Sequence, residues 1–211
     1  MEIYYTEDGL RYYQTPVGNF PSVTTILRET ESEKEKEKLR KWQHKMDKVH
    51  GTGAAEKEST EAKERGTNTH KLIEEFLKGS QLNFPSDPYF AQALPILRML
   101  KSKWEAIEEG VYHENDGYAG RLDLLAVFND RASVMDFTTS KRLKRKQWIN
   151  GKFLQCSAYA IAHNWLYKGN VDNLVVIVLS PKKMQIFEDD LQTWQPSWEE
   201  RLEQFYQKGE K

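Results

Sequence analysis

Two β-rich segments separated by three residues each carry an aspartate among apolar side chains, and this pairing constrains the fold more than any other feature of the chain. The segments are 118–128 and 132–137, and Asn129-Asp130-Arg131 joins them. Turn residues between two β-prone runs are typical of a hairpin, so we expect adjacent antiparallel strands. Asp123 and Asp136 then lie on neighbouring strands, where a charge among apolar residues is costly unless it is paired or binds a metal.

A turn at 129–131 places Asp123 opposite Phe137, one residue beyond Asp136. A bulge or the twist of the sheet would bring the two carboxylates into one site, and hard oxygen ligands of this kind suit Mg²⁺ or Mn²⁺. Thr138 is two residues from Asp136, so it points to the same side of the strand. The alternative for each aspartate alone is an ordinary carboxylate at a turn or strand end.

The rest of the chain alternates helical and β-prone segments. We expect an N-terminal hairpin at 3–5 and 10–13, and then a helical arm over 22–65 that is interrupted at 51–53. The later helices are expected at 67–77, from Ser86-Asp87-Pro88 through Trp104, at 153–165 and from a capping box at Ser197 to Phe205. The later strands are expected at 175–179 and 184–187. This order indicates an α/β or α+β fold.

Composition narrows the class of protein. The 211 residues are 38% hydrophobic, with 31 Lys and Arg against 32 Asp and Glu, as in soluble globular proteins of one domain. The single cysteine, Cys156, cannot form an internal disulfide, which favours a reducing compartment. The sequence shows no signal or transit peptide and no stretch long enough to span a bilayer. We therefore expect a monomer in the cytoplasm of a bacterial or phage-infected host cell, without a membrane partner.

A basic run follows the second aspartate, although the formal net charge of the chain is only -1. It comprises Lys141, Arg142, Lys144, Arg145, Lys146 and Lys152, with Trp148 among them. Cationic side chains neutralise phosphates and an aromatic ring stacks on a base, so this combination suits single-stranded nucleic acid. A solvated loop is the alternative.

Four motifs in order resemble the RecB-type exonuclease branch of the PD-(D/E)xK nuclease superfamily, especially its phage and mitochondrial members. The motifs are Arg65-Gly66-Thr67 with His70 and Glu74, Gly120-Arg121 with Asp123, Asp136-Phe137 with Thr139-Ser140, and Gln155 with Tyr159-Ala160. The resemblance covers nearly the whole chain. It implies a restriction-endonuclease-like α/β fold, with a central mixed β-sheet flanked by helices and an N-terminal β-hairpin and helical arm. It also implies one nuclease domain over 1–211, with the hairpin and arm at 1–65 and the core at 66–211.

The resemblance implies a role for each site residue. His70, Asp123, Asp136 and the Phe137 carbonyl would hold Mg²⁺ or Mn²⁺, which would polarise a phosphate and activate water. Gln155 and Tyr159, neighbours on one helical face, would point into the same catalytic site. Glu114 would lie just outside the ligands, and Glu74 would orient His70 or form a helical ion pair. The implied activity is a DNA exonuclease that prefers single strands or free ends, which an overlying arm would help to thread.

One position departs from the family pattern, because Thr138 stands where the family has a lysine. A neutral hydroxyl cannot stabilise developing negative charge as an ammonium does. Three explanations are open: the lysine was removed by engineering, Lys141 reaches back into the site, or the chain is a weakened or inactive homologue. The rival functions are a non-catalytic nucleic-acid-binding module and a scaffold that docks a partner on the charged helix of the arm.

Overall fold

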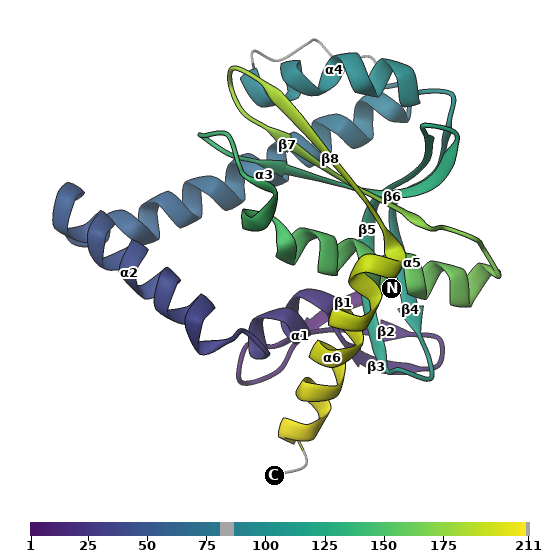
Figure 1. The fold of residues 1–211 in the computed structure, drawn as a ribbon, viewed down its shortest axis with the longest axis horizontal. Helices are drawn as coiled ribbons and strands as arrows, with labels where there is room; N and C mark the ends of the chain where they lie inside the picture. The colour runs from purple at the N-terminus through teal and green to yellow at the C-terminus, as the bar shows by residue number, and fades with distance from the viewer. Residues whose placement is uncertain (81–86, 210–211) are drawn as a thin grey trace.

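The computed structural model describes residues 1–80 and 87–209, and its centre is a five-stranded mixed β-sheet with helices on both faces (Figure 1). The sheet order is β4-β5-β6-β7-β8, in which β6 and β7 are parallel and the other neighbours are antiparallel. The strands are β4 (Trp104–His113), β5 (Tyr118–Phe128), β6 (Arg131–Thr139), β7 (Asn173–Leu179) and β8 (Met184–Asp190). The predicted α/β architecture with a central mixed sheet is confirmed.

A small antiparallel sheet and a helical arm precede this core. The N-terminal sheet has three strands, β1 (Glu2–Tyr5), β2 (Arg11–Thr15) and β3 (Gly18–Pro21), where the sequence predicted only the first two. The arm consists of α1 (Val23–Glu29), α2 (Glu33–His50) and the beginning of α3 (Ala54–Leu77). Figure 1 shows α2 and the first half of α3 projecting from the body as a helical hairpin. None of the residues of α2 is buried, which agrees with its charge on every side.

The two faces of the sheet are covered by different helices (Figure 1). On one face, α4 (Pro88–Leu100) and the end of α3 pack on apolar residues such as Met135 and Phe137. On the other face lies α5 (Asn150–Tyr167), which connects the parallel strands β6 and β7 and packs with α1 and with α6 (Leu191–Gly209). A helical crossover of this kind is how parallel neighbours are joined. The site described below lies midway along β5 and near the end of β6, where α3 and α5 approach the sheet from opposite faces.

The hairpin that carries the aspartates is tighter than the sequence predicted. Phe128 pairs with Arg131, so only Asn129 and Asp130 form the turn, and both have positive φ angles of 50° and 61°. This is the two-residue turn whose twist matches that of antiparallel strands. The register therefore differs by one residue from the prediction. Leu124 pairs with Met135, where the predicted register would pair it with Asp136.

Two helix boundaries were also predicted wrongly. The helix that Asp87 caps ends at Leu100, and Trp104 begins β4, where it pairs with Ala126 of β5. Ser86, the other residue of the predicted cap, lies outside the described residues. The last helix begins at Leu191 rather than Ser197, because Pro196 in its second turn removes a backbone donor without ending the helix. Within the described residues, no helix is both long and apolar enough to cross a membrane.

Candidate functional site

Three potential metal ligands converge where α3 meets the edge of the sheet. Nδ1 of His70 lies 3.5 Å from Oδ2 of Asp123 and 3.6 Å from Oε1 of Glu108. The pairs on either side of Glu108 put it opposite Asp123 in the β4–β5 ladder, so the two carboxylates face each other across neighbouring strands. One ligand atom from each residue lies within 4.8 Å of the others. An imidazole and two carboxylates at this spacing are a suitable donor set for a divalent cation.

Backbone contacts fix the orientation of this group. His70 donates from Nε2 to the carbonyl oxygen of Phe137 at 2.6 Å, and the backbone N–H of Phe137 donates to Oδ2 of Asp123 at 2.9 Å. Metal-binding histidines usually donate their second ring N–H to a carbonyl or carboxylate in this way, which leaves the other nitrogen for the ion. The Phe137 carbonyl, implied as a ligand by the family pattern, thus accepts a hydrogen bond from His70.

The electrostatics of the group favour a bound cation. Burial alone would lower the pKa of His70, but the negative charges of Asp123, Glu108 and Asp136 outweigh it and raise that pKa to about 9. Burial also raises the pKa of Asp123, although His70 and Lys152 oppose this effect. The negative potential of the carboxylates therefore stabilises a positive charge at this place, and a divalent ion would be stabilised by the same potential.

Asp136 is paired with a lysine that comes from α5. Its side chain is only 3% exposed, and Oδ1 lies 3.0 Å from Nζ of Lys152. Among the described residues, Oδ2 of Asp136 has no hydrogen-bond partner. Burial raises the pKa of Asp136 to about 6 against the opposing effect of Lys152, whereas Asp136 and Asp123 raise the pKa of Lys152 although burial alone would lower it. A buried carboxyl oxygen without a partner is costly, and it is an available ligand atom.

Lys152 belongs to a row of polar side chains on one face of α5. Its ammonium lies 3.4 Å from Oε1 of Gln155, whose amide in turn donates to the hydroxyl of Tyr159 at 3.1 Å. The spacing predicts that Gln155 and Tyr159 are neighbours, and this hydrogen bond confirms it. Gly120 explains how the row approaches the sheet, because a Cβ at position 120 would overlap the ring of Tyr159. The glycine of the Gly120-Arg121-x-Asp123 motif therefore makes room for the row.

The basic segment between β6 and α5 is tied to surface acids. Lys141 contacts Glu58 and Glu61 of α3 at 2.6 and 3.5 Å, so its ammonium lies on α3 rather than on the carboxylates of the site. Lys146 pairs with Asp189 at 2.8 Å.

The segment also carries an exposed aromatic ring. Trp148 is 58% exposed, and the guanidinium of Arg145 lies over its ring. Arg142 is exposed and Lys144 is half-buried. Arg142, Lys144 and Arg145 precede η1 (Lys146–Trp148) in the chain, and Thr138 is half-buried on β6.

Sequence reasoning missed two members of the site. Glu108 lies in β4, a strand that the sequence analysis did not predict because its glutamates give no clear alternation. Glu114, the acid predicted to lie near the ligands, is exposed in the turn between β4 and β5. Lys152 was counted with the basic run, although its spacing of three from Gln155 puts both on one helical face and could have identified it.

Glu74 was predicted either to orient His70 or to form a helical ion pair. It pairs with Lys78, one turn further along the chain, as the second alternative predicts.

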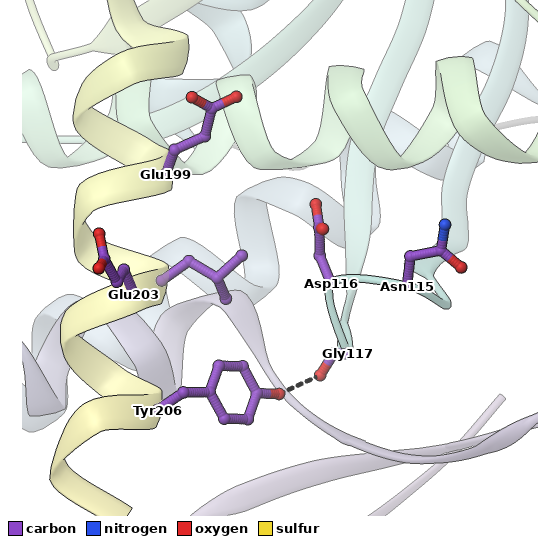
Figure 2. A pocket seen from close by; sticks show the side chains of 7 residues that line it. Asn115, Asp116, Gly117, Glu199, Glu203 and Tyr206 are labelled. Atoms are coloured by element: carbon purple, nitrogen blue, oxygen red, sulfur yellow. Dashed lines mark hydrogen bonds between the residues drawn. The ribbon is translucent and has the colours of Figure 1, made fainter.

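A second hollow, of about 610 Å³, lies away from this site, between α6 and the turn that joins β4 to β5 (Figure 2). Asp116, Glu199 and Glu203 line it, and the hydroxyl of Tyr206 donates to the carbonyl of Gly117 at 2.6 Å. These three acids repel phosphates, so this hollow does not suit a nucleic-acid backbone. The chemistry points instead to the junction of α3, β5, β6 and α5.

Comparison with known proteins identifies relatives along most of the chain, although no family model matches it. The chain is 28% identical over 205 residues to human mitochondrial genome maintenance exonuclease 1, which is 89% of this chain and 58% of the human protein. The proteins of the same name from Xenopus tropicalis and mouse are 26% and 27% identical, over 92% and 90% of this chain. The chain thus corresponds to about three fifths of the length of these relatives.

Proposed function

We propose that this chain is a divalent-metal-dependent DNA exonuclease of the RecB-type branch of the PD-(D/E)xK superfamily. The observation that carries the proposal is the convergence of His70, Glu108 and Asp123, with Asp136 on the adjacent strand. The similarity to proteins named as exonucleases supports the same class of reaction. A monomeric state and a cytoplasmic location in a bacterial or phage-infected host stay predictions.

His70, Glu108 and Asp123 would hold Mg²⁺ or Mn²⁺, and the free oxygen of Asp136 lies on the same strand pair. Such an ion supplies Lewis-acid polarisation of a phosphate and a more acidic water. In the hydrolysis, a water oxygen bonds to phosphorus while the bond from phosphorus to the leaving sugar oxygen breaks. The water gives its proton to solvent and the leaving oxygen takes one from solvent. The chain's own residues hold the strand and balance the charge that builds on the phosphate oxygens.

The basic segment with Trp148 would bind the single strand or free end that the site requires. Exposed cations and a ring available for stacking suit a strand whose bases are unpaired. The arm of α2 and α3 borders this segment, because Glu58 and Glu61 of α3 contact Lys141. An end threaded beneath the arm would pass the loop before it reaches the carboxylates.

The test is cleavage of end-labelled linear single-stranded DNA with Mg²⁺ or Mn²⁺ and with EDTA, against a circular strand of the same sequence. The proposal expects metal-dependent shortening of the linear strand and an intact circle. Cleavage of the circle would refute dependence on ends. If both the parent and Thr138→Lys bind metal and DNA but neither cuts, the chain is the non-catalytic binding module instead. An RNA strand of the same sequence tests the preference for DNA.

A further inference from the structure

The positive charge that the sequence lacks at position 138 has a source elsewhere in the fold. Side chains alternate along a strand, so Asp136 and Thr138 of β6 project to one face of the sheet. Val134, two residues earlier, packs in the core that includes α5, so this is the face that α5 covers. Lys152, near the beginning of α5, places its ammonium 3.0 Å from Oδ1 of Asp136.

The position of Lys152 is built by several contacts. Oε1 of Gln155 accepts from the Lys152 ammonium, and the amide of Gln155 donates to the hydroxyl of Tyr159. Gly120 leaves room for the Tyr159 ring. About a third of the Lys152 side chain remains exposed, at 33%, whereas Asp136 is buried. The ammonium itself contacts Oδ1 of Asp136 and Oε1 of Gln155.

The ion pair with Lys152 leaves the second oxygen of Asp136 without a partner among the described residues. A pair whose only role was structural would be expected to satisfy both buried oxygens. Two lysines of the basic run are held elsewhere: Lys141 on Glu58 and Glu61, and Lys146 on Asp189.

We propose that Lys152 supplies, from α5, the positive charge that Thr138 cannot supply from β6, and that its ammonium stabilises the charge building on the scissile phosphate. This inference rests on the proposed nuclease function and names the residue that makes it possible without a lysine at position 138. Lys152 keeps its proton throughout, so its contribution is electrostatic and adds nothing to the balance of the hydrolysis.

The experiment compares the parent with Lys152→Met, Lys152→Gln, Lys152→Arg and the double variant Lys152→Met/Thr138→Lys, with the exposed Lys182→Met as the matched control. Both neutral variants should lose about 10²–10³-fold in kcat, as when one charge-stabilising donor is removed, with little change in KM. Lys152→Arg should keep part of the activity, and Lys182→Met all of it. Lysine restored at position 138 should rescue the double variant.

A second readout separates catalysis from structure. Mn²⁺ binding by calorimetry and thermal unfolding are measured on the same proteins, and the neutral variants should bind Mn²⁺ at least as tightly as the parent because a cation beside Asp136 has gone. Lys152→Gln keeps a hydrogen-bond donor if Lys152→Met unfolds. Neutral variants with the kcat of the parent would overturn the inference. The inference would also be overturned if the neutral variants lost Mn²⁺ binding and lysine at position 138 failed to restore the activity of the double variant.

The parent distinguishes this inference from the proposed function. A parent that is inert while Thr138→Lys cuts would overturn the role of Lys152 and leave the nuclease site standing. A parent and a Thr138→Lys variant that are both inert with Mn²⁺ bound would overturn the nuclease function itself.

Discussion

The lysine of the buried site and the lysines of the exposed loop differ in what they contact, although they belong to one stretch of sequence. Lys152 meets Asp136, a buried carboxylate, whereas Lys141 and Lys146 meet carboxylates at or near the surface. Lys141 is only three residues from Thr138, yet its side chain goes to α3, while Lys152 returns to β6 because α5 packs across the sheet. Proximity in sequence to a missing charge therefore says little about which residue replaces it.

Because the ion pairs of the two regions differ in burial, we expect the two regions to have different roles. In the buried site, ion pairs are shielded from water, so each charge has a large effect on its neighbours. In the loop, screening by salt weakens each pair, and under the proposed function the cations would act together on an extended strand. We expect substitutions in the site to change turnover and substitutions in the loop to change DNA affinity.

The largest effect is expected from Asp123→Asn. The amide oxygen can still accept from the backbone N–H of Phe137, so the fold should persist while a negatively charged ligand is lost. Cleavage should fall by about 10³-fold, with DNA affinity in EDTA unchanged. Asp8→Asn, in the exposed turn between β1 and β2, is the control. Full activity of Asp123→Asn would remove the carboxylate site from the mechanism.

Gly120→Ala should disturb the buried row without touching a charge. The added methyl group overlaps the Tyr159 ring, so we expect a loss of about 1–3 kcal/mol in the free energy of unfolding, measured by denaturant titration. Gly151→Ala in α5 is the matched control, since no atom lies within 4 Å of its added Cβ and alanine favours a helix. Equal stabilities of the two variants would mean that the row does not depend on Gly120.

Trp148→Ala tests the other side of the comparison. Its exposed ring should stack on a base, so its loss should weaken binding of single-stranded DNA by about 1–3 kcal/mol, while kcat at saturating DNA stays constant. Trp148→Phe should keep most of the affinity. A fall in kcat with unchanged affinity would place Trp148 in the catalytic site and break the division of work.

The smallest effects should come from single loop charges. Arg142→Gln should reduce the slope of log affinity against log salt by about 0.7, the value for one phosphate contact on a single strand. Lys141→Gln should change the slope less, because its ammonium must first leave Glu58 and Glu61. A larger change in slope for Lys141→Gln than for Arg142→Gln would show that Lys141 binds DNA in preference to the glutamates of α3.

Local patterns predicted β5 and β6, because Asp123 and Asp136 stand among apolar residues of unmistakable β character. The one-residue error in register came from the length of the turn, which depends on whether Asn129 and Asp130 adopt positive φ angles. Glu108 escaped because β4 is recognised by its pairing with β5, a contact that no local pattern reports. Lys152 escaped because its significance depends on how α5 crosses the sheet.

The most direct test of the account is a crystal structure of the parent chain with Mn²⁺ and a single-stranded oligonucleotide whose linkages resist hydrolysis. We expect an anomalous manganese peak among His70, Glu108 and Asp123, and a phosphate oxygen within hydrogen-bonding distance of Lys152, with Lys141 still on Glu58 and Glu61. A phosphate bound by Lys141 while Lys152 contacts only Asp136, or manganese elsewhere in the molecule, would contradict it.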